Sequence, residues 1–450
     1  MRTRKRSRLC FGAGFALLVV LAAAMPRPVL AQSLVELGRQ LFNEETFDGN
    51  GRTCATCHPA TNNFTIDPKL IRTLPPRDPL FVAEFNPDLK DLEKPRLMRR
   101  FGLILENVDG FDQPGVMRGV PHNLGLRTNM RSDLPGAADA LGWSGDGSAG
   151  GGSLREFAIG AVTQHLPKTL NREAGVDFRL PTDEELDAIE AYMLSVGRQE
   201  ELDLGAMTFT DPAVENGKLL FNGEGANRAC STCHANAGAN RSSNGVNGNF
   251  DTGAAQRRPR GAPPDGGFGQ DEVAGIEGFG DGKMNTPSLI EAADTPPFFH
   301  NSSARTLEDA VKFYTTRTFG NSPAGLLGGD GEPNPFVLTG RQIREIGALL
   351  RVLNARENIR FSNEIAGEAQ RTEPREEADA RIREAIAETK DAVEVLDRGP
   401  LKVYRDAVES LKQAARLEQR ALREESDDER DSLLQQAIEL KSEASASMVQ

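Results

Sequence analysis

Two short segments of this chain carry the residue types best suited to chemistry. Cys54-Ala55-Thr56-Cys57-His58 recurs as Cys230-Ser231-Thr232-Cys233-His234. In a Cys-x-x-Cys-His segment the two thiols can add to the vinyl groups of one porphyrin, and the His that follows can bind its iron. We therefore predict two covalently bound haem c groups. Cys54 and Cys57 attach the first and Cys230 and Cys233 the second, with His58 and His234 as axial iron ligands.

Other uses of paired cysteines fit these segments poorly. A zinc site built from two Cys-x-x-Cys pairs does not need a trailing His in both. A thioredoxin-like redox pair needs a βαβ context, which neither segment shows. The chain has five cysteines, and the remaining one, Cys10, lies in the N-terminal segment. We therefore expect disulfides to play no part in stability.

Residues 1–31 have the features of a secretory signal peptide. A basic stretch at residues 2–8 precedes an apolar run at residues 9–25, and Val29-Leu30-Ala31 forms a small-residue cleavage site. The alternative is a retained membrane anchor, but the Pro26-Arg27-Pro28 break argues against it. Export together with covalent haem predicts the periplasm of a Gram-negative bacterium as the location of the mature protein.

The chain is acidic, with a formal net charge of −13 at pH 7. Loss of the six basic residues among the first 31 would change this charge to −19. Such a charge repels nucleic acid and anionic lipid and favours a basic partner. We expect a small basic electron-donor cytochrome or a similar redox protein as the partner, and no nucleic acid.

The surroundings of the two haem motifs match, which indicates an internal repeat. Residues 35–43 and 214–222 precede the motifs, and both stretches are typical of short amphipathic helices. Each half closes with a capping box, Thr182 with Glu185 and Thr339 with Gln342, followed by apolar residues at helical spacing. In a cytochrome c domain the first and last helices pack across each other. We predict a mainly α fold with two tandem cytochrome c-like haem domains, residues 32–200 and 205–360.

Residues 361–450 differ in character from the rest of the chain. They are highly charged, and their apolar residues recur at helical spacing on both sides of a Gly399-Pro400 break. This pattern predicts a C-terminal extension made of a helical hairpin and a final helix. Two interpretations remain open: an appendage packed on the body, or an element for oligomerisation or docking.

The haem motifs, the closing helices and the segment 295–301, followed by Thr-Leu-Glu-Asp-Ala-Val at 306–311, resemble the bacterial di-haem cytochrome c peroxidase family. That family includes the methylamine-utilisation (MauG-type) di-haem enzymes, and the resemblance covers roughly residues 34–354. It implies that the first haem meets hydrogen peroxide and the second passes electrons. We therefore expect a peroxidase-like oxidoreductase that reduces peroxide or uses it to oxidise a substrate. We also allow for one calcium ion between the domains.

The resemblance assigns roles to two residues between the motifs. Leu141-Gly142-Trp143-Ser144-Gly145-Asp146-Gly147 matches the family's Trp-Asp-Gly-type motif, which implies that Trp143 lies between the haems; a core Trp is the alternative. The family's acid-base residue, often Glu, follows, and here the matching stretch holds His165. His165 could move the peroxide proton from the near to the far oxygen. It could instead ligate the iron, or bond a haem propionate.

Several residues compete as the sixth iron ligand at each haem. The peroxidases carry a displaceable His after the first motif where this chain has Leu74, so the resemblance implies a permanently open first haem, with His122 as a reserve ligand. At the second haem, spacing favours Met284. The resemblance places the ligand at Tyr314, as in the methylamine-utilisation enzymes, and we prefer Tyr314, with His300 third.

Two other functions compete with the enzyme. A non-enzymatic di-haem electron carrier would have Met117 or Met130 as the sixth ligand of the first haem. A haem-bearing scaffold would use its helical tail to recruit partners.

Overall fold

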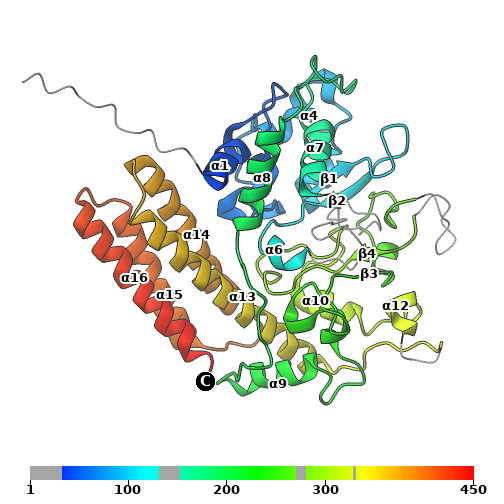
Figure 1. Cartoon of the computed structure of the whole chain (residues 1–450). Coiled ribbons are helices and arrows are strands. Elements are labelled where there is room, and N and C mark those ends of the chain that lie inside the picture. The colour runs from blue at the N-terminus through cyan, green and yellow to red at the C-terminus, as the bar shows by residue number, and fades with distance from the viewer. Residues whose placement is uncertain (1–32, 131–152, 270–279, 328–330) are drawn as a thin grey trace, which may run out of the picture. The chain divides into compact units, whose positions relative to one another are not determined.

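The computed structural model describes residues 33–130, 153–269, 280–327 and 331–450 (Figure 1). This part of the chain is mainly helical, as predicted, and residues 34–450 form one compact unit. The expected signal peptide and Trp143 lie outside the described residues. None of the described helices combines the length and the apolar character that a membrane crossing requires.

The first half is a set of short helices around one antiparallel hairpin. Its elements are α1 (Leu34–Glu44), α2 (Cys54–Cys57), α3 (Pro68–Ile71), α4 (Val82–Phe85), α5 (Pro95–Phe101), β1 (Leu103–Glu106), β2 (Val116–Gly119), α6 (Leu126–Asn129), α7 (Leu154–His165) and α8 (Asp183–Ser195). In the hairpin Leu103 pairs with Gly119 and Glu106 with Val116. Thr182 caps α8 through the predicted capping box with Glu185.

The second half repeats the opening and closing helices around longer irregular segments. Its elements are α9 (Pro212–Phe221), β3 (Asn249–Phe250), β4 (Met284–Asn285), α10 (Leu307–Phe313), α11 (Arg317–Gly320), α12 (Pro323–Leu326) and α13 (Gly340–Ala369). The strands β3 and β4 pair antiparallel. Thr339 and Gln342 form the predicted capping box at the start of α13.

In both halves the opening helix crosses the closing helix at a glycine. Gly38 of α1 lies against the carbonyl of Ala188 in α8, and Gly217 of α9 lies against the carbonyl of Glu345 in α13. A Cβ atom at either glycine would overlap that carbonyl. The two glycines occupy the same place in the repeat, because each is the fourth residue of a Val-Glu-x-Gly segment. The predicted crossing of first and last helices is confirmed in each half.

The helix α13 links the second half to the C-terminal extension. It continues without a break through residues 360 and 361, where the sequence suggested a boundary. The extension consists of α14 (Arg375–Arg398), α15 (Arg405–Ala421) and α16 (Asp427–Ser447), and α14 ends directly before Gly399-Pro400 as predicted. α14 and α16 pack on α13, and α15 packs on both α14 and α16 (Figure 1).

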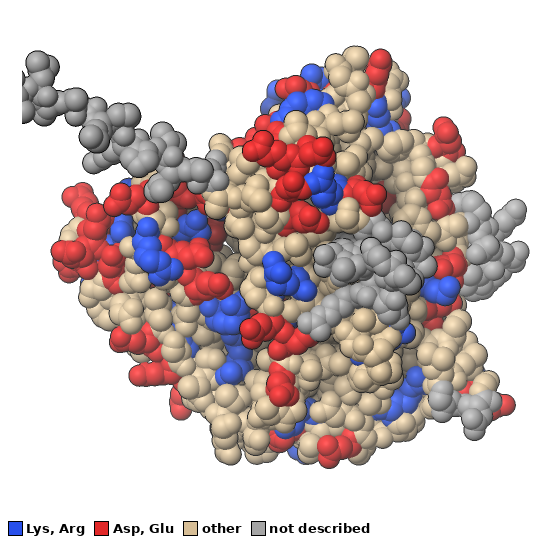
Figure 2. Space-filling model, viewed as in Figure 1, with Lys and Arg blue, Asp and Glu red and all other residues tan. Residues whose placement is uncertain are grey.

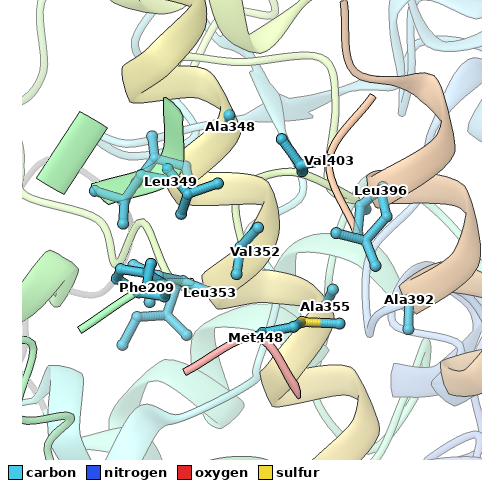
Figure 3. Packing of buried hydrophobic residues seen from close by; sticks show 14 of the residues in the cluster. Phe209, Ala348, Leu349, Val352, Leu353, Ala355, Ala392, Leu396, Val403 and Met448 are labelled. Atoms are coloured by element: carbon cyan, nitrogen blue, oxygen red, sulfur yellow. The ribbon is translucent and has the colours of Figure 1, made fainter. Parts of the chain in front are cut away.

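An apolar core joins the extension to the second half. Figure 3 shows its members around α13, with Leu349, Val352 and Leu353 from that helix, Leu396 from α14, and Met448 from the chain end. These side chains are almost fully buried. The extension is therefore packed on the body of the protein, and its use in oligomerisation stays a prediction.

Candidate haem sites

The first motif lies on a single helical turn. Thr53 caps α2, and its backbone N–H donates to Thr56 Oγ1 over 2.9 Å. This capping box begins the helix one residue before Cys54, so Cys54 and Cys57 lie one turn apart and His58 follows at the helix end. The local structure therefore presents both thiols and the imidazole together.

His58 has the form that an iron ligand requires. Its Nδ1 lies 2.9 Å from the backbone carbonyl of Phe64, so this nitrogen donates and Nε2 is left for a metal. Burial lowers the pKa of His58 to about 4, which keeps the ring neutral at pH 7. A neutral imidazole with one nitrogen anchored to a carbonyl is the usual arrangement of a metal-binding His.

The second motif has the same arrangement of side chains, but its backbone forms a 3-10 turn in place of an α-helical turn. Cys230–Thr232 form a turn of 3-10 helix, and His234 follows Cys233. His234 Nδ1 lies 3.1 Å from the carbonyl of Pro287 and 3.3 Å from that of Gly238. Burial lowers the pKa of His234 to about 4. Both histidines are thus neutral and anchored through Nδ1.

The surroundings of the four thiols favour their protonated form. Burial raises the pKa of Cys54, Cys57 and Cys230 to about 12 each, and it also raises that of Cys233. A redox-active Cys pair usually has a lowered thiol pKa instead. No group of three or more His, Cys, Asp or Glu in the described ranges could hold a metal ion, so the expected calcium finds no support there. The two motifs are compatible with two haem c sites.

An arginine two residues before each cysteine pair fixes the loop that covers the motif. Arg52 is almost fully buried, and its guanidinium donates to the carbonyls of Pro79 and Leu80 over 3.1 and 2.6 Å. Arg228 likewise donates to three carbonyls, those of Ala324, Gly325 and Asn334. Sequence reasoning missed both residues, although the repeated Arg-x-Cys-x-x-Cys-His spacing is a usable signal.

Arg52 also connects the first motif to the hairpin. Its Nη1 lies 3.0 Å from Glu93 Oε1, in an ion pair that is buried on both sides. The other oxygen of Glu93 accepts the backbone N–H of Leu105 in β1 over 2.9 Å. A buried pair of this kind is costly to break from one side, so it holds β1 in place beside the motif.

The hairpin brings a carboxylate to His165. Glu106 ends β1, and its Oε1 lies 3.2 Å from Nε2 of His165, the last residue of α7. The other ring nitrogen, His165 Nδ1, is buried and has no hydrogen-bond partner. The carbonyl of His165 accepts Asn50 Nδ2 over 2.9 Å, which ties the end of α7 to the loop before the first motif. Glu106 was not found from the sequence, because nothing links it to a residue so far along the chain.

His165 and Glu106 lie close to the first motif. Both side chains are within electrostatic range of the His58 imidazole, and Glu106 is also within range of Cys57. The structure therefore places His165 near the first motif, with one ring nitrogen held by a carboxylate. The charge of His122 also reaches His58, and His122 Nδ1 is buried without a partner.

Tyr314 lies at the second motif. It follows α10 and packs in an aromatic cluster with Phe313, Phe319 and Phe336, against which Cys230 also packs. Burial raises the pKa of its phenol, and the thiols of Cys230 and Cys233 add to this effect.

The other ligand candidates at the second motif lie in different surroundings. Met284 is in β4, paired with Phe250 of β3. His300 is almost fully buried, and its Nε2 lies 3.3 Å from the carbonyl of Asp265. Asp265 itself is bound by both Nε and Nη2 of Arg118.

The two methionines considered as ligands of the first haem lie in different apolar clusters. Met130 belongs to the apolar cluster against which Cys54 packs. Met117 belongs to another cluster, with Leu97, Leu103 and Ala262. Leu74, at the place of the family's displaceable His, packs with Cys57 on the cluster that includes Ile71.

Comparisons with known proteins give little further information. No family model and no curated protein matches the sequence. Among solved structures, a chain of hydrazine synthase from Kuenenia stuttgartiensis is similar, with 17% sequence identity and a TM-score of 0.37. The match covers 78% of this chain and 99% of that chain. A similarity at this level is too low to identify a fold or a function.

Proposed function

We propose that this protein is a di-haem c-type oxidoreductase in which hydrogen peroxide reacts at the first haem and electrons pass through the second. The observation that carries the proposal is the position of His165. It lies beside the first haem motif with Nε2 held by Glu106 and Nδ1 buried without a partner. A carboxylate-oriented imidazole is the usual apparatus for proton transfer to a reacting group.

The residues of each motif fit the cofactor. Cys54 and Cys57 would hold the first haem, and Cys230 and Cys233 the second. His58 and His234 would hold the iron through Nε2, because Nδ1 of each is engaged by a carbonyl. Haem c supplies the redox-active iron when it is bound. The polypeptide contributes the neutral histidines, the arginine-anchored loops and the apolar surroundings of the thiols.

His165 then has a defined task in peroxide reduction. Reducing one hydrogen peroxide to two water molecules consumes two electrons and two protons. With Nε2–H donating to Glu106, Nδ1 of His165 is the basic nitrogen, which accepts a proton from one peroxide oxygen and returns it to the other. Glu106 fixes this tautomer and orientation. A haem c held at the second motif would supply the route for electrons from a donor.

Replacement of His165 tests the proposal. The His165→Ala protein should react with peroxide about 10²–10⁴ times more slowly, which is the usual contribution of general acid–base catalysis. Stopped-flow absorbance of the ferric protein measures this rate. Thr163→Ala, on the same helix, is the matched control, because the Thr163 hydroxyl donates only to the carbonyl of Ile159. An unchanged rate in the His165 variant contradicts the proposed role.

One observation favours the alternative of a simple electron carrier. Met130 is buried in the cluster that also contacts Cys54, so a thioether is present near the first motif. If Met130 were a ligand of the first iron and the second iron also had six ligands, both haems would be low-spin and inert to peroxide. A high-spin ferric band that changes rapidly with peroxide favours the enzyme, and its absence favours the carrier.

A further inference from the structure

The charge around the second haem motif is opposite to that of the chain as a whole. Residues 225–264 contain five arginines and one acidic residue, Asp251, in a chain with a net charge of −13. The segment 295–327 adds three cations, Arg305, Lys312 and Arg317, and two acidic residues, Glu308 and Asp309. Glu308 is paired with Arg351 of α13. Acidic side chains are spread widely over the face of the molecule in Figure 2. A basic region in such a protein is a local feature of the second half.

Contacts bring these basic segments together. The amide Nδ2 of Asn301 donates to the carbonyls of Ala254 and Arg257. Gly253 lies against Thr318, which follows Arg317 directly. The guanidinium of Arg257 lies 5.4 Å from the centre of the Phe313 ring. The loops that carry Arg257, Arg305 and Arg317 therefore pack around one aromatic cluster.

The outer arginines of these loops are not neutralised. Arg258, Arg260, Arg305 and Arg317 are exposed. Among the ion pairs between described residues, none involves these four side chains. In the extension, by contrast, Arg375 is paired with Asp379 over 2.7 Å, and Arg381 and Arg398 are also paired with carboxylates. The charge of the four arginines is available to a partner.

The same region presents apolar surface beside the haem motif. The backbone N–H of Val337 donates to Asn227 Oδ1 over 2.8 Å, which holds Val337 next to the segment that leads into Cys230. The side chain of Val337 is 71% exposed and that of Leu327 is 56% exposed. Arg228 and Arg241 lie near enough to Cys233 to lower its pKa against the effect of burial. An apolar centre with a charged rim is the usual composition of a protein interface.

We propose that the surface formed by Arg258, Arg260, Arg305 and Arg317, together with Val337, is the docking site of an acidic electron-carrier protein. This proposal rests on the electron-passing role of the second haem in the proposed function, and it does not depend on peroxide chemistry. It differs from the basic partner expected from the net charge. A docked partner responds mainly to charges within a Debye length, which is about 10 Å at 0.1 M salt. The charge of the local surface, and not the net charge of the chain, therefore determines which partner binds there. An extended anionic membrane or nucleic acid would also meet the acidic surroundings, which favours a compact protein.

The test uses the full two-haem protein and a plant-type ferredoxin as an acidic probe. Stopped-flow absorbance follows reduction of the haems by reduced ferredoxin, and calorimetry measures binding of the oxidised form, at salt concentrations from about 10 mM to about 0.3 M. Wild-type protein should react and bind most strongly at low salt. The variant R258Q/R260Q/R317Q should react about tenfold more slowly at low salt and lose most of the salt dependence.

A charge-matched variant separates docking from net charge. Arg405, Arg416 and Arg420 are exposed on α15 of the extension, so R405Q/R416Q/R420Q changes the net charge equally and should leave both measurements unchanged. The proposal is overturned if the two triple variants behave alike, or if ferredoxin reduces the wild-type protein faster as salt increases. It is equally overturned if mitochondrial cytochrome c, a basic probe, or phosphatidylglycerol vesicles bind the wild-type protein more tightly than ferredoxin does. If the first haem does not react with peroxide in the same samples, the proposed function is contradicted. The conclusion about docking is not affected.

Discussion

The surroundings of Tyr314 determine how easily its phenol ionises. Its ring lies 5.0 Å from that of Phe319 and 5.4 Å from that of Phe313, and both contacts are edge-on. Burial in this cluster disfavours the phenolate, so the pKa is raised. A haem iron held by His234 would supply a positive charge that stabilises a phenolate here. A phenolate is a hard anion that favours ferric iron and lowers the reduction potential.

Substitution of Tyr314 by Phe should therefore change the second haem and not the fold. The phenyl ring keeps the contacts with Phe319 and Phe313, while the phenol oxygen, which is the proposed iron ligand, is lost. We expect an altered ferric spectrum and a higher reduction potential for the second haem, measured by spectroelectrochemistry. Met284→Leu is the matched comparison and should leave the spectrum unchanged. Loss of a sulfur-to-iron band in the Met284 variant alone would show that Met284 is the ligand.

Sequence reasoning recovered the residues of each motif, because their chemistry depends on local spacing. It could not find Glu106, whose link to His165 depends on the pairing of β1 with β2. Nor did it find Arg52 and Arg228, although both precede a cysteine pair by two residues. The carbonyls that anchor His58 and His234 belong to backbone at different distances along the chain, which no repeat predicts.

At the scale of the helices, the starts of α8 and α13 could be predicted from the sequence. The end of α13 could not. The capping boxes at Thr182 and Thr339 begin α8 and α13 where expected. The end of α13 was missed because its buried face changes from apolar residues to polar ones such as Asn358 and Ser362. A polar residue on a buried face weakens the hydrophobic period on which such predictions depend. The structure shows why these residues are tolerated there.

Ser362 belongs to a buried polar network at the centre of the extension. The ammonium of Lys441 lies 2.6 Å from Glu418 Oε1 and 2.7 Å from Ser362 Oγ, and all three side chains are fully buried. Thr389 of α14 also donates to Glu418 Oε1, over 3.1 Å. The network thus joins α13, α14, α15 and α16. Burying the pair has a desolvation cost, so its main contribution is to fix how the four helices align.

Loss of one partner from this network should be costly. Lys441→Met leaves Glu418 buried without a counter-ion, and we expect the free energy of unfolding to fall by about 3–5 kcal/mol. The double variant K441M/E418L replaces both charges with apolar groups and should recover most of that loss. Denaturant unfolding followed by far-ultraviolet circular dichroism measures both variants. Equal destabilisation of the single and double variants would show that the loss of stability comes from altered packing and not from the unpaired charge.

At the scale of the whole molecule, the extension contacts both halves of the body, each of which carries one Cys-x-x-Cys-His motif. Towards the first half, Glu377 of α14 pairs with Arg39 over 2.7 Å. In addition, Asp391 accepts Asn63 Nδ2 over 3.2 Å, a few residues after the first motif. Towards the second half, the Tyr404 hydroxyl donates to the carbonyl of Met448 and accepts the backbone N–H of Asp211. The extension therefore acts as a brace between the halves, a role that periodicity alone could not reveal.

The last three residues of the chain complete this brace. The backbone N–H of Thr210 donates to the carbonyl of Met448 over 3.1 Å, and that of Gln450 donates to the carbonyl of Thr208 over 2.9 Å. Val449 forms a bridge with Phe209, and the Met448 side chain is fully buried beside Ala355 and Phe209 (Figure 3). These contacts tie the chain end to the segment that leads into α9.

Removal of residues 448–450 should loosen that segment without preventing haem attachment. The thiols and histidines of both motifs lie outside these contacts, so haem content should stay the same. We expect faster amide hydrogen exchange at residues 208–211, and a loss of about 2–5 kcal/mol of stability from the missing Met448 side chain. Met448→Ala is the control: it keeps the backbone bonds, so it should lose similar stability while Thr210 remains protected. If exchange at Thr210 is as slow in the truncated protein as in the full chain, then the remaining contacts, such as that of Tyr404 with Asp211, hold this segment, and the chain end is not part of the brace.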